Sequence, residues 1–244
     1  MFRKGVLLLV SFLLLSTTLL LLRWDNGIPT LAENEKKEEA LLVERALQAK
    51  GITDIEPVDV QQLQGDFSPI AGNEIILAIT LGKHQAFLAA FEQESNRLIA
   101  LSRDLSMVTK ISTFELPGME QRGLFVVEHA DNRVGSFEET TWNRIFRIDE
   151  NNVFQQVFAH VQVSEYYWHE SWDDPKGLYW HGVQEESAFT YPSPDKIHIA
   201  KKINRLKVAG DPHILPDNFT VESQEDAVKV YQWDGEALRF MEQK

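Results

Sequence analysis

The sequence predicts a mainly β protein built from antiparallel sheets, with one N-terminal transmembrane helix and one amphipathic helix beside the membrane. Three observations predict this class. A charge-free apolar run opens the chain, apolar residues at helical spacing follow it, and after Gly51 short apolar runs alternate with turn residues. We expect antiparallel hairpins to stack into these sheets.

The composition limits the classes of protein to which the chain can belong. Its 244 residues suit one domain plus an anchor or two small domains, and the hydrophobic content of 43% is enough for a packed core. Its formal net charge of −13 repels phosphate backbones, so no nucleic-acid partner is expected. The absence of cysteine excludes disulfides and thiolate metal sites, and it mildly favours a bacterial source.

The N-terminal segment, residues 5–22, is predicted to be a membrane anchor. It carries no charge and is rich in leucine. As a helix rising about 1.5 Å per residue it spans about 27 Å, close to the hydrocarbon thickness of a bilayer. Arg3 and Lys4 precede it and predict a cytoplasmic N-terminus with the remaining chain outside the cell membrane. The alternative is a cleaved signal peptide, which would make the protein secreted.

Three parts follow from this pattern. Residues 1–24 form a cytoplasmic tip and the anchor, residues 25–55 a charged linker with a helix, and residues 56–244 a β-rich extracytoplasmic domain. Apolar residues recur at helical spacing within residues 33–50, and Gly51 is suited to cap that helix.

Short apolar runs after this helix predict strands, and turn residues between them predict hairpins. Polar residues 149–152 separate two of the runs and predict one hairpin. Asp234 and Gly235 separate the last two and predict a two-residue tight turn, with positive φ at Gly235. The expected strands are residues 75–81, 86–91, 98–101, 123–128, 144–148, 153–158, 197–199, 228–233 and 236–241.

Two short stretches carry a family resemblance. Gly65, Asp66 and Phe67, followed by residues 72–78, resemble the opening of an FG-GAP or VCBS-type repeat, and residues 230–235 are similar to the hairpins that end such blades. The resemblance implies the propeller-like sheets of exported bacterial proteins, so an incomplete propeller-like assembly is expected as the alternative to stacked hairpins. The family's calcium loop is rich in aspartate, whereas residues 68–71 of this chain contain none, so calcium binding is not carried over.

The densest aromatic segment, residues 166–181, contains the candidate ligand-binding residues. Aromatic faces beside carboxylates and other polar groups can bind a sugar ring or a peptide. The alternative is that these rings fill the core beneath a long loop, and we expect most of them to be buried, with one or two exposed at the loop edge. The candidates are Trp168, Trp172, Trp180, Tyr179 and Asp173.

These observations predict a non-catalytic binding or scaffolding module at the cell surface. Its expected partner is cell-wall glycan or another surface protein. The alternative is a hydrolase of cell-wall glycan or peptide that uses Glu170, Asp173 or Asp174, because glycosidases work with paired carboxylates. No catalytic residue, metal site or cofactor is assigned, since the sequence contains no metal-ligand spacing, nucleophile motif or dinucleotide fingerprint.

Overall fold

A computed structural model describes residues 31–132 and 137–243 of the chain. The chain divides into two compact units, residues 1–42 and residues 43–244. The predicted anchor, residues 5–22, lies outside the described residues. Within the described ranges, none of the helices has the length and apolar content needed to cross a bilayer.

The helix expected at residues 33–50 is confirmed as α2 (Leu31–Lys50). It ends where Gly51 adopts a φ of 75°, and the N–H of Gly51 bonds back to the carbonyl of Gln48 at 3.0 Å. This is the left-handed cap that glycine provides at little steric cost. Within the second unit, Lys50 Nζ donates to the carbonyl of Ser102 at 2.9 Å, which ties the last turn of the helix to the loop after β4.

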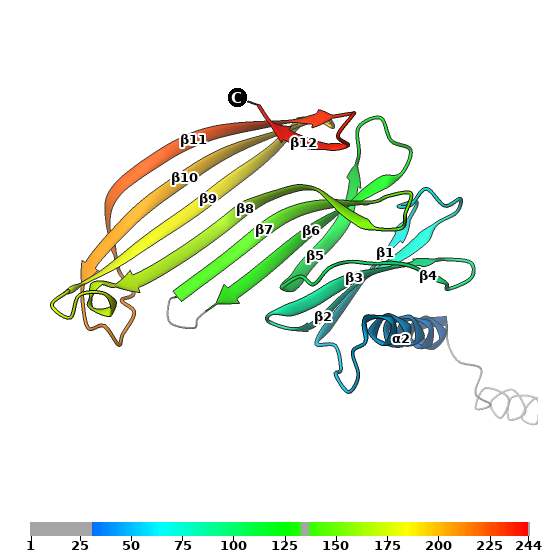
Figure 1. The fold of residues 1–244 in the computed structure, drawn as a ribbon, viewed down its shortest axis with the longest axis horizontal. Coiled ribbons are helices and arrows are strands. Elements are labelled where there is room, and N and C mark those ends of the chain that lie inside the picture. Colours follow the sequence, from blue (N-terminus) through cyan, green and yellow to red (C-terminus); the bar gives the residue numbers. More distant parts are fainter. Residues whose placement is uncertain (1–30, 133–136, 244) are drawn as a thin grey trace, which may run out of the picture. The chain divides into compact units, whose positions relative to one another are not determined.

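The strands of the described residues belong to the second unit and form two antiparallel sheets, which confirms the mainly β prediction (Figure 1). In both sheets each strand pairs with its neighbours in the sequence. The first sheet consists of β1 (Asp59–Gly65), β2 (Glu74–Gly82), β3 (Gln85–Glu92) and β4 (Leu98–Leu101). The second consists of β5 (Met107–Glu115), β6 (Arg122–Asn132), β7 (Phe137–Ile148), β8 (Phe154–His169), β9 (Tyr179–Ser193), β10 (Lys196–Ala209), β11 (Thr220–Asp234) and β12 (Arg239–Glu242).

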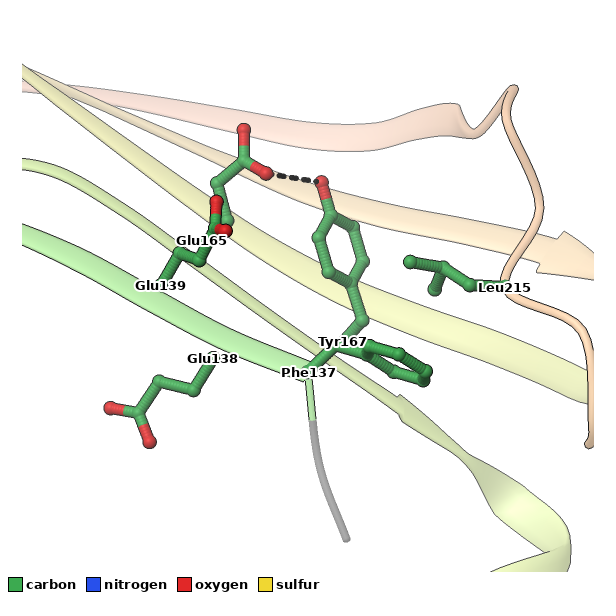
Figure 2. Close-up of a pocket in the computed structure, with 6 residues that line it drawn as sticks. All are labelled: Phe137, Glu138, Glu139, Glu165, Tyr167 and Leu215. Carbon is green, nitrogen blue, oxygen red and sulfur yellow. Dashed lines mark hydrogen bonds between the residues drawn. The ribbon is translucent and has the colours of Figure 1, made fainter. Parts of the chain in front are cut away.

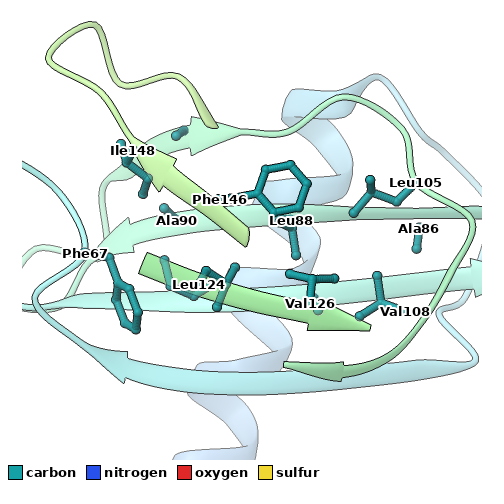
Figure 3. Packing of buried hydrophobic residues seen from close by; sticks show 13 residues of the cluster. Phe67, Ala86, Leu88, Ala90, Leu105, Val108, Leu124, Val126, Phe146 and Ile148 are labelled. Atoms are coloured by element: carbon teal, nitrogen blue, oxygen red, sulfur yellow. The ribbon is translucent and has the colours of Figure 1, made fainter. Parts of the chain in front are cut away.

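The main core lies between the two sheets (Figure 3). Strand β3 contributes Ala86, Leu88 and Ala90 to it, and the facing strand β6 contributes Leu124 and Val126. The alternate residues of β3 are buried as well, so its sequence is a continuous apolar run rather than an alternating one. Strands that are covered on both faces have this pattern.

The loop that resembles a calcium-binding repeat is organised by the carboxylate of Glu74, which is 1% exposed. This carboxylate accepts hydrogen bonds from Phe67 N at 2.6 Å, Ser68 N at 3.1 Å and Ser68 Oγ at 2.7 Å. A buried carboxylate is costly unless it is hydrogen-bonded, and these three bonds satisfy it. The loop therefore closes around an anion supplied by its own chain.

The last hairpin exists, but its expected two-residue turn is wrong. Asp234 pairs with Arg239, so four residues form the loop, and the positive φ of 50° falls on Leu238 rather than on Gly235. The cause is the Asp234 carboxylate, which accepts hydrogen bonds from the N–H groups of Glu236 and Ala237, each at 2.9 Å. Aspartate at the start of a turn competes in this way with the tight turn that the Asp-Gly pair favours.

Candidate functional site

The aromatic segment forms the end of β8, the short 3₁₀ helix η1 (Glu170–Trp172), a turn and the start of β9. Gly177 allows this turn to close, because a Cβ at that position would lie 2.3 Å from Glu170 Cβ. Since successive side chains on a strand point to opposite faces, Tyr166 and Trp168 lie on one face of the sheet and Tyr167 and His169 on the other.

One side of this segment is core. Trp180 is completely buried, and its indole N–H donates to the carbonyl of Asp211 at 2.8 Å. His169 is 1% exposed, with Nε2 3.1 Å from the carbonyl of Gly210. Tyr167 is also buried and completes this small core. Trp180 was a candidate ligand-binding residue, but as a core side chain it presents no surface to a ligand.

The other face carries a row of stacked rings. The ring centroids of Tyr166 and Trp168 lie 5.2 Å apart with an interplanar angle of 28°, and those of Trp168 and His181 lie 5.3 Å apart at 18°. Trp168 and His181 are cross-strand partners on β8 and β9. Tyr166 is 40% exposed. We call Tyr166, Trp168 and His181 the aromatic row.

A lysine continues the aromatic row onto β10. Lys207 is the cross-strand partner of His181, and its Nζ lies 4.4 Å from the ring centroid of the exposed Tyr179. This is a cation–π contact. Lys207 Nζ also lies 4.0 Å from carboxylate oxygens of Glu170 and Glu222. Rings, a cation and carboxylates are thus combined on one surface.

Glu170 is held in its ionised form. The hydrogen bond from His181 Nε2, at 2.7 Å, is the largest cause of the lowered pKa of Glu170, and backbone N–H groups that include that of Leu178 lower the pKa further. A general acid needs a raised pKa, so this carboxylate is poorly suited to donate a proton near neutral pH. Asp173 and Asp174 are exposed on the turn. Asp174 Oδ1 accepts the N–H of Lys176 at 3.0 Å, as in an ordinary Asx turn.

A serine and a histidine also meet here without forming a nucleophilic pair. His169 Nδ1 lies 2.8 Å from Ser171 Oγ and accepts the N–H of Ser171 at 3.1 Å, so the imidazole caps η1. Its other nitrogen faces a backbone carbonyl. Both ring nitrogens are therefore engaged in local structure, which leaves neither to activate a hydroxyl for attack.

Trp172 is the most exposed of the candidate tryptophans, at 44%. It meets the buried Trp180 edge-on, with ring centroids 5.5 Å apart. The structure thus brings Trp168 and Tyr179 to the open face, places Trp172 and Asp173 at the turn and buries Trp180. The expectation that most of these aromatic side chains are core is wrong, because only Tyr167, His169 and Trp180 are buried.

A pocket of about 140 Å³ lies on the opposite face of the sheet (Figure 2). Its lining residues come from β7, β8 and the loop before β11: Phe137, Glu138, Glu139, Glu165, Tyr167 and Leu215. Tyr167 OH donates to Glu165 Oε2 at 3.3 Å and accepts from Gln184 Nε2 at 2.8 Å. Burial is the main cause of the raised pKa of Tyr167, which keeps the phenol protonated. No sequence pattern indicated this pocket, because strand pairing brings its residues together.

The described ranges contain no group of three or more histidine, aspartate or glutamate side chains that could hold a metal ion. Comparison with known proteins identifies no relative, since no family model, no curated protein and no solved structure matches the chain. The resemblance to propeller repeats therefore stays a prediction, and the site itself carries the functional argument.

Proposed function

We propose that this protein is a membrane-anchored extracytoplasmic binding module that holds a cell-wall glycan on the aromatic row. The observation that carries this proposal is the row itself, with Lys207 and Tyr179 beside it. Three rings from two strands stack on one sheet face, with Tyr166 exposed and Trp168 and His181 half-buried, and contiguous aromatic surface of this kind commonly marks a binding site.

The chemistry of the row suits a sugar. A sugar ring has an apolar face of C–H groups and a rim of hydroxyls. The exposed ring of Tyr166 can contact the C–H face. The carboxylate of Glu170 can accept hydrogen bonds from the hydroxyls, and the ammonium of Lys207 can donate to them. Sites of this kind combine aromatic area with a few placed polar groups.

A binding role without catalysis agrees with the state of the acidic groups. Glu170 accepts a hydrogen bond from His181 at 2.7 Å and has a lowered pKa, whereas the general acid of a glycosidase has a raised one. Asp173 and Asp174 are exposed on the turn, and Asp174 is already engaged by the N–H of Lys176. The hydrolase alternative therefore has no specific observation in its favour.

Attachment to the membrane is proposed from residues 5–22 and the basic residues before them. The charged helix α2 would then begin close to the membrane. The protein should remain in the membrane fraction after a carbonate wash, and protease added to intact protoplasts should digest the part after Leu22. A soluble form that begins near residue 33 would instead show a cleaved signal.

The test of the binding site is a pull-down of the full-length protein on insoluble cell-wall glycan. Tyr166→Ala should lower retention by about tenfold or more, because aromatic anchors dominate such surfaces. Tyr191→Ala is the matched control, since Tyr191 is similarly exposed, at 45%, but is not part of the row. Equal retention of the two variants would show that the aromatic row is not the binding site. Retention on a surface protein rather than on glycan would show that glycan is not the ligand.

A further inference from the structure

The outer edge of β11 is a long unpaired strand edge (Figure 1). Strand β12 covers only its end, because residues 231–234 of β11 are the ones that pair with residues 239–242. In the described part of the chain, residues 220–229 have no strand on that side. An edge of this length presents a row of free backbone donors and acceptors.

The direction of these backbone groups follows from two hydrogen bonds. The carbonyl of Val230 points outward, since it accepts from Gln243 N at 2.8 Å just beyond β12. Trp233 N points inward and donates to the carbonyl of Asp195 at 2.9 Å. Because the direction alternates along a strand, Asp226 and Val228 turn their N–H and C=O groups to the outer edge. Val228 is 75% exposed, so its backbone is accessible to another chain.

The charge of the edge selects its occupant. Glu222, Glu225 and Asp226 are all exposed and lie within the unpaired stretch, and the lysine of that stretch, Lys229, is paired with Glu242 at 3.0 Å. Two copies of β11 paired with each other would bring these carboxylates together, and like charges across a strand pair are destabilising. A segment with basic residues would instead place opposite charges beside them. The net charge of −13 also favours a basic partner over a second copy.

We propose that the edge of β11 binds an extended basic segment of a partner protein, which adds to the second sheet as an antiparallel strand. Backbone hydrogen bonds to residues such as Asp226 and Val228 provide the pairing. Glu225 and Asp226 select lysine or arginine side chains, and Glu222, which lies 4.0 Å from Lys207 Nζ, adds to the negative charge of the edge. This mode of recognition is β-strand addition. It goes beyond glycan binding at the aromatic row, and neither site requires the other.

The test uses the full-length protein in detergent and a ten-residue peptide of alternating lysine and valine. The expected result is saturable binding, with slower hydrogen exchange at the outward-pointing amides of Gln224, Asp226 and Val228. The control peptide has the same sequence with alternate amides N-methylated, which keeps the charge but removes half of the backbone donors. It should bind about tenfold more weakly or worse.

Two variants test the same edge from the protein side. Val228→Pro removes an outward N–H, which proline at an edge tolerates, and should weaken binding about tenfold, while Val228→Ala should leave it unchanged. Glu225→Gln, which keeps both backbone groups, should weaken binding about two- to fivefold and reduce its salt dependence. Near-ultraviolet circular dichroism establishes that each variant is folded.

Three results would overturn the proposal. The first is an absence of peptide binding to the folded wild-type protein. The second is equal binding of the N-methylated peptide, which would show that the peptide binds through its charge and not through backbone hydrogen bonds to β11. The third is a wild-type dimer in sedimentation that Val228→Pro abolishes, which would assign the edge to a second copy.

Discussion

Trp180 gives the sharpest test of the division between core and surface in the aromatic segment. It is completely buried, and its indole N–H donates to the carbonyl of Asp211 at 2.8 Å. Its ring centroid lies 5.2 Å from that of His169 and 5.5 Å from that of Trp172. Replacing a buried tryptophan with alanine costs about 3–5 kcal/mol, from lost burial and from the cavity that remains. For a chain of this size, about 1 kcal/mol corresponds to roughly 2–4 °C in Tm. Trp180→Ala should therefore lower Tm by about 6–20 °C.

Trp172→Ala is the matched comparison, because Trp172 lies eight positions earlier and is 44% exposed. Trp172→Ala should lower the free energy of unfolding by about 1 kcal/mol and Tm by roughly 2–4 °C. Thermal unfolding of the full-length protein in detergent, followed by circular dichroism, measures both variants. If Trp172→Ala lowers Tm as much as Trp180→Ala does, the assignment of Trp180 to the core and of Trp172 to the surface is refuted.

Three further predictions concern other parts of the chain. Glu74→Ala should cost about 2–4 kcal/mol in urea unfolding, because two buried N–H groups lose their acceptor, and Glu74→Gln should cost less. Gly235→Ala should leave Tm unchanged or raise the free energy of unfolding by up to about 1 kcal/mol, since Gly235 lacks positive φ and a Cβ there meets open space. A clear drop in Tm would instead support the two-residue turn with positive φ at Gly235. His160→Phe should flatten the fall in the free energy of unfolding as the pH drops below about 6.5, measured by urea titrations at several pH values.

The sign of the histidine effect follows from linkage. Burial is the largest cause of the lowered pKa of His160, and the nearby Lys229 and Lys201 lower it further, while Glu185 and Glu242 oppose them. The unfolded chain therefore binds a proton at this residue at a higher pH than the folded chain does. The stability that the neutral imidazole contributes is present above the unfolded pKa of about 6.5 and is lost as the pH falls toward the folded value. An identical pH profile in the variant would contradict this account.

Much of the fold could be predicted from local patterns. Residues 98–101 were expected as a strand and form β4, and the runs at residues 75–81 and 86–91 form most of β2 and β3. Each of these runs is apolar and flanked by turn residues, which is the signal that sequence reasoning detects best. The helix was equally clear, because Gly51 marked its end.

The aromatic segment was harder for a physical reason. Tyr166, Tyr167, Trp168 and His169 continue β8, but all four are aromatic, so the alternation of polar and apolar residues that usually marks the two faces of a strand is missing. Burial separates them only when the whole sheet is known. Lys207 could not be found either, since its place beside His181 depends on the register of the long β9–β10 hairpin.

The pairing of each strand with its sequence neighbours has a consequence for the order of folding. The second sheet can grow one hairpin at a time from β5, in the order in which the ribosome produces the strands, with short loop closures at each step. The closing contact comes last, when Phe240 of β12 packs against Phe158 of β8, with ring centroids 5.9 Å apart. A chain that stops before β12 would keep every ladder from β5 to β11 and would leave Phe158, now 4% exposed, without this cover. The last few residues thus complete the cover of the smaller cluster around Phe158, while the main core between the sheets does not depend on them.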